Sequence, residues 1–388
     1  MHRLNVDHVR LLLSRRGWQQ TELADALGAS NASVSQWING EHLPRPGALL
    51  KLAKILGAKL EELLIIPTEE DESRPLIAFR RKGQQKTTEF NEEEALSQAH
   101  ALERVAEYLP ARTFRPREFQ DPAADYARVE ELAGIVRSEI LADAKSEASI
   151  GWESLVHWFG LNGAVLIPVF WGERQHHGNA LHVFLPECGH TFIYINLDSE
   201  ELDFKFWLAH EMAHMLTPSL VGLEEGEDFS DAFAGALLFP QRLAARAYSD
   251  AIEATRPSDL FAILRRHAVD AGVSLNTVYH QVDRLAKAQD VRALRIDNSK
   301  LHQHRRVLDQ ESGRIGAKFF QDAPKAADYV QVCKDRFQSS FFDALRLHLS
   351  ASADGPAFVS RVLHSSLADA MEIHATLMGA SPDVHHSD

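Results

Sequence analysis

The chain has 388 residues, which predicts two or three domains, and its 45% hydrophobic and 25% charged residues exclude a disordered, collagenous or disulfide-built protein. No apolar run approaches the roughly 20 residues of a membrane helix, and the charged start MHRLNVDHVR lacks a signal peptide's apolar stretch, so we expect a cytoplasmic protein without membrane contact. The formal net charge of −14 opposes extensive binding to nucleic-acid phosphates.

The first 66 residues are expected to form a separate DNA-binding domain. They carry eight Lys and Arg against six Asp and Glu, whereas the rest of the chain carries 33 against 49. Apolar residues recur at helical spacing between Val6 and Ile66 and are interrupted by glycine and proline, which predicts five short helices. Residues 17–56, GWQQTELADALGASNASVSQWINGEHLPRPGALLKLAKIL, resemble a lambda-repressor-type (XRE) helix-turn-helix.

The resemblance assigns a place to each residue of this motif. The matching residues are Leu23 and Ala24 on the first helix, Gly28 in the turn, Ser30 as N-cap, and Val34 and Trp37 on the buried side of the second helix. The outward residues of the second helix, which would meet base edges in a major groove, are Asn31, Ala32, Ser33, Ser35 and Gln36. Gln20 begins the preceding helix and is placed for a phosphate or base contact.

The partner of this N-terminal module follows from its class and its charge. Such modules gain affinity by pairing on two half-sites about one helical turn apart, so we expect a homodimer on DNA. The alternative is a helix-turn-helix that binds protein or has lost its affinity for DNA, because its surface is poorly basic.

Residues 67–120 are expected to connect two domains. The run PTEEDESRP at 67–75 is acidic, flanked by prolines and poor in apolar residues, which is typical of a solvated linker. A helix is predicted from Asn91, as its N-cap, to Leu109, before Pro110.

A mainly α chain with an α+β centre is expected overall, and that centre spans residues 121–290. A helical stretch at 125–145 precedes three β-branched and aromatic runs, at 164–171, 180–186 and 191–197, which predict a small sheet. After Asp198 the apolar residues change to helical spacing until Pro218, and the residues on one side are Leu202, Phe206, Ala209, Ala213 and Leu216. A second helix is predicted over 227–238, and residues 291–388 show helical patterning without a chemical motif.

The string LAHEMAHML places an HExxH arrangement on the first of these two helices. Residues i and i+4 share one face of a helix, so His210 and His214 can reach a single ion while Glu211 approaches the water beside it. A glutamate so placed takes a proton from that water and passes it to a leaving amine. The motif therefore predicts a catalytic zinc site with one Zn²⁺ per chain.

A third ligand is expected from the following helix, GEDFSDAFAGALLFP. Glu227 and Asp231 lie four residues apart on one face; we expect Glu227 to bind the ion, and Asp231 to accept the outer N–H of a bound imidazole. Asp228 and Glu225 are competing ligand candidates. Two cysteines, Cys188 and Cys333, lie far apart without CxxC spacing, so we expect no thiolate site.

The strings FIYINLDSEELDFKFWLAHEMAHML and EDFSDAFAGALLFP resemble the ImmA/IrrE-type metallopeptidases. The corresponding positions are Asn196, Phe206, Phe233, Ala234, Leu237, Leu238 and Pro240, while Ser230 replaces the family's usual alanine. VSLNTVYHQVDRL (273–285) resembles the family's closing helix, so the likeness covers about residues 125–290. It implies a zincin-like (gluzincin-like) domain. It also implies limited cleavage of one protein, commonly a DNA-bound repressor or an antitoxin.

Two hypotheses for the activity of the central domain remain open at this point. The leading one is a DNA-associated regulatory zinc endopeptidase, and the other is a transcription regulator whose zinc-binding domain serves as a sensor or scaffold and cuts nothing. The presence of Glu211 favours the first, because a catalytically inactive descendant would be free to lose it. Tyr279 or His280 could stabilise the transition state, but packing is the commoner role for such a helical pair, and neither is assigned to the site.

Overall fold

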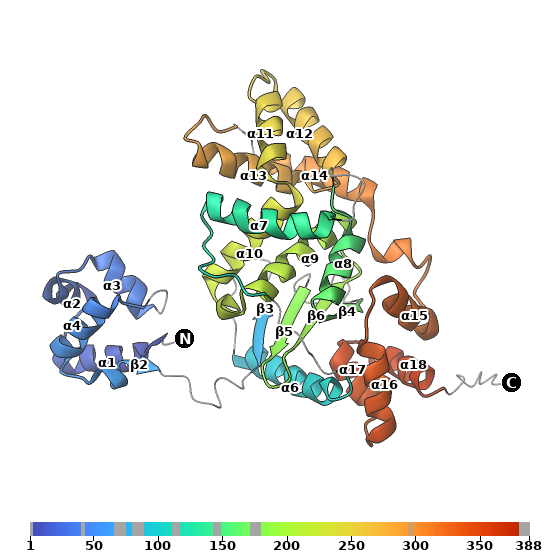
Figure 1. Ribbon diagram of the computed structural model, residues 1–388, viewed down its shortest axis with the longest axis horizontal. Helices are drawn as coiled ribbons and strands as arrows, with labels where there is room; N and C mark the ends of the chain where they lie inside the picture. The colour runs from blue at the N-terminus through green and yellow to red at the C-terminus, as the bar shows by residue number, and fades with distance from the viewer. Residues whose placement is uncertain are drawn as a thin grey trace. The chain divides into compact units, whose positions relative to one another are not determined.

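The computed structural model describes residues 3–39, 43–65, 75–79, 89–110, 117–142, 149–170, 180–294, 296 and 298–379. The chain divides into two compact units, Met1–Arg74 and Pro75–Asp388 (Figure 1). Each unit has its own hydrophobic core. The acidic run predicted as a linker lies outside the described residues, apart from Pro75.

The N-terminal unit is helical, as predicted, with a small addition. Its helices are α1 Val6–Arg16, α2 Gln20–Leu27, α3 Asn31–Ile38, α4 Pro46–Leu56 and the 3₁₀ turn η1 Leu60–Glu62. The fifth predicted helix is thus a single 3₁₀ turn. The sequence analysis did not predict the antiparallel pairing of β1 Arg3–Leu4 with β2 Leu64–Ile65, which joins the two ends of the unit.

The turn between α2 and α3 follows from two residues. Gly28 ends α2 with a φ of 67°, a left-handed conformation that glycine adopts without a steric penalty. Ser30 then begins α3, because its Oγ accepts a hydrogen bond from the backbone N–H of Ser33 at 3.1 Å. Leu23 and Val34, from the two helices, are both buried in the core of the unit. This turn therefore fixes the direction of the second helix.

The larger unit contains a four-stranded sheet in the order β3-β5-β6-β4. Its strands are β3 Leu76–Phe79, β4 Ala164–Val169, β5 Ala180–Leu185 and β6 His190–Asn196. β4 runs parallel to β6, while the other neighbours are antiparallel. The three strands predicted at 164–171, 180–186 and 191–197 are confirmed to within two residues at each end. β3 is an addition, and it comes from the segment that was expected only to connect domains.

Helices make up the rest of the central part of the larger unit, and α8 and α9 contact the sheet. They are α7 Tyr126–Leu141, α8 Trp152–Leu161, α9 Glu201–Leu216, η2 Pro218–Leu220, α10 Glu224–Leu238, α11 Gln241–Ala251, α12 Pro257–Ala271 and α13 Leu275–Ala288. α9 packs on β5 and β6, and α10 packs along α9. The buried surface of α9 extends beyond the predicted apolar side, because every residue from Leu208 to Leu216 is buried, including the polar His210, Glu211 and His214. α9 is therefore the central helix of the unit.

Helices from both ends of the larger unit share its core. They are α6 Glu89–Ala106, α14 Asn298–Ser312, η3 Gly316–Lys318, α15 Ala326–Arg336, α16 Phe341–Ala351, α17 Pro356–Leu363 and α18 Leu367–Leu377. α6 begins at Glu89, two residues before the predicted N-cap at Asn91. Buried hydrogen bonds join the sheet to the last helices, such as the one that Tyr194 Oη donates to the Val362 carbonyl at 2.7 Å. One core thus extends across the boundaries expected at residues 120 and 290.

Within the part of the chain that the structure describes, no helix is both long and apolar enough to cross a membrane.

Candidate metal centre

Two packed helices carry the predicted site. His210, Glu211 and His214 lie on α9, and Glu227 and Asp231 lie on the first two turns of α10. The first turn of α10 packs closely on η2, since a Cβ at Gly226 would lie only 2.1 Å from the carbonyl oxygen of Leu220. A glycine at this position therefore allows Glu227, the next residue, to reach the histidines.

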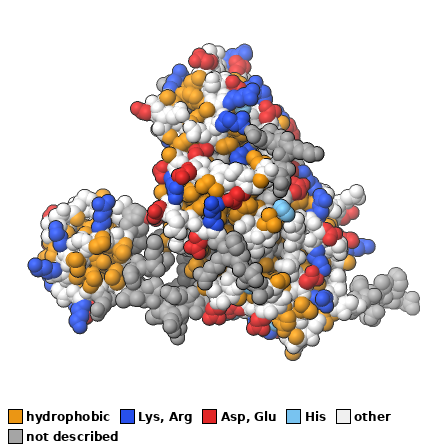
Figure 2. All heavy atoms as spheres, in the orientation of Figure 1, with side chains coloured by type: hydrophobic (Ala, Val, Ile, Leu, Met, Phe, Trp, Pro, Cys, Tyr) orange, Lys and Arg blue, Asp and Glu red, His pale blue; other side chains and the backbone are white. Residues whose placement is uncertain are grey.

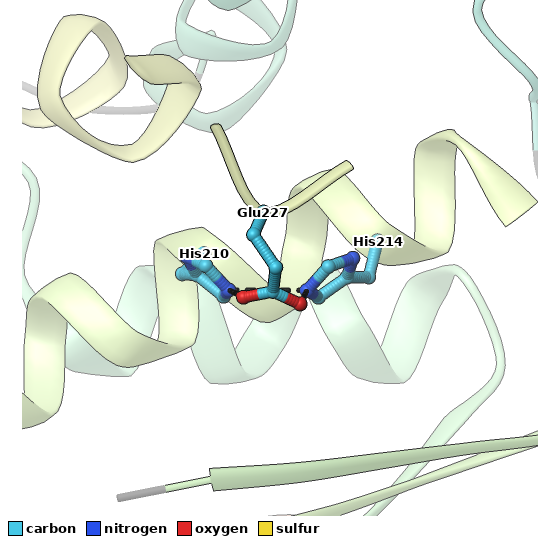
Figure 3. Close-up of side chains that lie close together, drawn as sticks. All are labelled: His210, His214 and Glu227. Atoms are coloured by element: carbon cyan, nitrogen blue, oxygen red, sulfur yellow. Dashed lines mark hydrogen bonds and ion pairs between the residues drawn. The ribbon is translucent and has the colours of Figure 1, made fainter. Parts of the chain in front are cut away.

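The three predicted ligands converge on one point. Figure 3 shows the carboxylate of Glu227 between the two imidazoles, with one oxygen directed at each ring. Glu227 Oε2 lies 3.4 Å from His210 Nε2, and Oε1 lies 3.2 Å from His214 Nε2. The two Nε2 atoms are 3.0 Å apart. Each residue thus offers one ligand atom to a group spanning less than 4.8 Å, an arrangement that could hold a metal ion.

The outer nitrogens of both imidazoles also have partners on α10. His210 Nδ1 lies 3.0 Å from Asp231 Oδ1, and His214 Nδ1 lies 3.3 Å from Ser230 Oγ. Because these contacts suit an Nδ1–H donor, they orient each ring with Nε2 toward Glu227, and a neutral ring in this orientation can offer its Nε2 lone pair to a metal ion. Asp231 lies where it was predicted, and Ser230, noted only as a departure from the family pattern, orients the second ring.

Glu211 follows His210 on α9, and its side chain contacts a strand of the sheet. Its side chain is 3% exposed, and its Oε2 lies 3.5 Å from Nδ1 of His182, a buried residue of β5. Burial would raise the pKa of Glu211, but the contact with His182 and the charges of the nearby histidines outweigh it and lower that pKa. The carboxylate is therefore held in its ionised form, which is the form a general base requires.

His182 was not predicted from the sequence. A single histidine in the apolar strand ALHVFLP has no motif around it, and only the packing of β5 on α9 brings it to Glu211. The one available signal was a polar residue inside an otherwise apolar strand, since such a residue needs a buried partner.

The charges of the ligand group shift two pKa values in opposite directions. Burial lowers the pKa of His210, but its hydrogen bonds to Asp231 and Glu227 outweigh that effect and raise the pKa to about 9. Burial likewise raises the pKa of Glu227, and the two imidazoles reverse this and lower it well below its usual range. Without an ion, the group thus resembles a buried ion pair between His210 and Glu227.

The residues considered as alternatives lie elsewhere. Glu225 and Asp228 are exposed and do not belong to the ligand group formed by the described residues. Tyr279 is half-buried and packs against the hydrophobic core, while His280 is exposed.

The predicted DNA-contacting residues lie along α3 and at the start of α2. Asn31, Ala32 and Gln36 are exposed, as is Gln20, whereas Ser33 and Ser35 are half-buried. Ser33 Oγ lies 2.8 Å from Ser30 Oγ, so its hydroxyl contributes to the helix cap. Among the residues predicted to contact DNA, Asn31 and Gln36 are therefore the longest exposed side chains on α3.

Comparison with known proteins identifies the N-terminal part. The helix-turn-helix family model matches residues 9–63, which include α2, α3, α4 and most of α1. The unit is an XRE-type helix-turn-helix domain, and the match supports a DNA-binding regulatory role. No curated protein matches the chain. The metallopeptidase resemblance of the central part and the cytoplasmic location stay predictions.

Proposed function

We propose that this chain is a DNA-associated regulatory zinc endopeptidase. Its helix-turn-helix domain would bring it to DNA or to a repressor bound there. Its central domain would cleave one protein of the repressor or antitoxin kind. The observation that carries the proposal is the convergence of His210, His214 and Glu227 on one point, with an ionised, buried Glu211 on the same helix.

The distances within the ligand group support zinc. Two donors bound at about 2.0–2.1 Å to a tetrahedral ion lie roughly 3.3 Å from each other. The two Nε2 atoms are 3.0 Å apart, and His214 Nε2 and His210 Nε2 lie 3.2 and 3.4 Å from Oε1 and Oε2 of Glu227, respectively. Two imidazoles and one carboxylate are also the ligand set of several catalytic zinc sites that keep a fourth position open. The residues present therefore fit the ion.

The chain's own residues would divide the work of hydrolysis. Zinc, when bound, would polarise the scissile carbonyl and acidify a water molecule. Glu211 would take the proton of the attacking water and pass it to the leaving amine. His182 holds the Glu211 carboxylate from the side of the sheet, while Asp231 and Ser230 hold the two imidazoles in the orientation that exposes Nε2.

A second candidate function is a zinc-dependent regulator that does not cut. The observation that favours it is burial: the side chains of His210 and His214 are 0% and 1% exposed, and only Glu227, at 29%, reaches solvent. A closed site of this kind is typical of structural zinc. The intact Glu211 argues for the enzyme, because a structural site has no use for an ionised carboxylate at this position.

Metal content tests both candidates first. Elemental analysis of purified protein should give about one zinc per chain in the wild type and much less in His214→Ala and Glu227→Ala. Asp228→Ala is the matched control, since Asp228 adjoins Glu227 but is exposed and lies outside the group. A wild type that holds no zinc, even after zinc is added, would contradict both candidates.

Proteolysis then separates the enzyme from the sensor. Cells that produce either the wild type or Glu211→Gln would be compared by mass spectrometry of protein N-termini. The enzyme predicts a new N-terminus that only the wild type generates, while both forms retain zinc. If both forms bind zinc and regulate transcription equally without any difference in cleavage, the chain is a sensor.

A further inference from the structure

A second feature of the larger unit lies between α11 and α12. These two helices line a hollow of about 1010 Å³, and none of the predicted metal-site residues contributes to it. Its charged lining consists of Arg242, Arg246 and Asp250 from α11 and Arg266, His267 and Asp270 from α12. On α11 these residues recur every four positions, so their side chains share one face of the helix.

Two of the three arginines in the hollow form no hydrogen bond or close ion pair among the described residues. Arg266 Nη2 donates to Asp250 Oδ2 at 2.5 Å, and the same oxygen accepts a hydrogen bond from His267 Nε2 at 2.8 Å. Arg266, His267 and Asp250 are thus hydrogen-bonded to one another. Arg242 and Arg246 have no hydrogen bond or close ion pair among the described residues, although the charge of Asp250 attracts Arg246 from four residues away. Since like charges four residues apart on a helix repel each other, an anion between them would remove a cost that the empty hollow carries.

The charge of this region contrasts with that of the chain around it. After residue 66 acidic residues outnumber basic ones by 49 to 33, yet Figure 2 shows Lys and Arg side chains gathered over α12. Arginine forks match the oxygen geometry of phosphate, and two forks can share one phosphate. Asp270 is an exposed carboxylate in the same hollow, and its oxygens can accept hydrogen bonds from hydroxyl groups.

We propose that this hollow binds a phosphorylated small molecule that carries hydroxyl groups. Its phosphate lies between Arg242 and Arg246, and its hydroxyls donate to Asp270. Leu243 and Ile263 supply an apolar wall for the carbon skeleton. The concave shape favours a small ligand over a duplex, whose phosphates are spread along a convex surface. This site does not depend on the metal centre.

Titration calorimetry with ribose 5-phosphate tests the site on the full chain at constant ionic strength. We expect one molecule per chain in the wild type and a loss of affinity of about tenfold or more in the double variant Arg242→Gln, Arg246→Gln. Arg246→Lys keeps the charge but loses the forked guanidinium, so its affinity should lie between those of the wild type and the double variant. Arg265→Gln is the matched control, because Arg265 adjoins Arg266 on α12 but pairs with Glu311 outside the hollow.

Two further comparisons locate the ligand. The wild type should prefer ribose 5-phosphate to inorganic phosphate, and Asp270→Asn should reduce that preference while strengthening the binding of inorganic phosphate a few-fold. His214→Ala should bind ribose 5-phosphate as the wild type does, so failure of the metal site leaves this result unchanged. The proposal is overturned if the wild type shows no saturable binding or if Arg265→Gln loses as much affinity as the double variant. It is also overturned if the double variant loses affinity for a DNA duplex but keeps its affinity for ribose 5-phosphate.

Discussion

At the scale of single residues, a proton and a metal ion compete for the imidazole of His210. Its pKa of about 9 in the metal-free protein means that its imidazole still holds a proton at pH 7, whereas a zinc ligand must be neutral. The apparent affinity for zinc should therefore rise about tenfold per pH unit from pH 7 and level off near pH 9. Competition with a chromophoric chelator across this range measures it.

Asp231→Asn provides the control for this pH dependence. Because the hydrogen bond to Asp231 helps to raise the pKa of His210, the zinc affinity of the variant should level off at a lower pH than that of the wild type. An affinity that does not change between pH 7 and 9 in the wild type would show that His210 is already neutral without the ion.

The pair of His182 and Glu211 offers a test that needs neither zinc nor substrate. His182→Ala leaves a buried carboxylate without its neighbour, and it should reduce the free energy of unfolding by about 1–3 kcal/mol. In the Glu211→Gln background, His182→Ala should reduce the free energy of unfolding by less, because a neutral amide is easier to bury than a carboxylate. Urea unfolding of the four proteins gives the coupling energy, and a value of zero would contradict the interaction.

At the scale of the elements, the close contact of α10 with η2 determines where Glu227 lies. Gly226→Ala places a Cβ 2.1 Å from the Leu220 carbonyl oxygen, so either the first turn of α10 or η2 has to move. We expect a loss of about 1–3 kcal/mol in the free energy of unfolding, together with weaker zinc binding. Gly134→Ala in α7 meets no atom within 4 Å and should instead gain roughly 0.5–1 kcal/mol. Equal changes in the free energy of unfolding for the two variants would contradict the close contact between α10 and η2.

The elements also show which parts of the fold sequence patterns can predict. α9 and the three strands were predictable because apolar spacing within 6 to 16 residues is a local property. β3 was not: it has four residues, follows an acidic run, and pairs with β5 about one hundred positions later. Its formation depends on a partner that local spacing does not reveal. The shared core of α6 and the last helices was missed for the same reason.

The candidate site divides in the same way. His210, His214, Glu227 and Asp231 were predictable because helical periodicity places residues four positions apart on one face, and the structure brings these four side chains together. His182 and Ser230 were not, since the first depends on a strand packing on α9 and the second on the exact rotation of α10. Patterns within one helix are visible in a sequence, whereas contacts between elements depend on the fold.

At the scale of the whole molecule, two separate cores predict two separate unfolding transitions. Zinc in about thousandfold excess over its dissociation constant should stabilise the larger unit by about 4 kcal/mol and leave the N-terminal unit unchanged. Scanning calorimetry with and without zinc checks this, and in His214→Ala neither transition should move. A single transition in the wild type would show instead that the two units stabilise each other.

The path of the chain between the two units has a mechanical consequence. β2 is the last element described in the N-terminal unit, and β3, whose Ala78 is the register partner of His182 on β5, is the first described in the larger unit. When one unit is anchored and the other is pulled, the force reaches β3 and is borne by the backbone ladder between β3 and β5. The strand that holds the neighbour of Glu211 is therefore the first partner strand to receive a force applied at the helix-turn-helix.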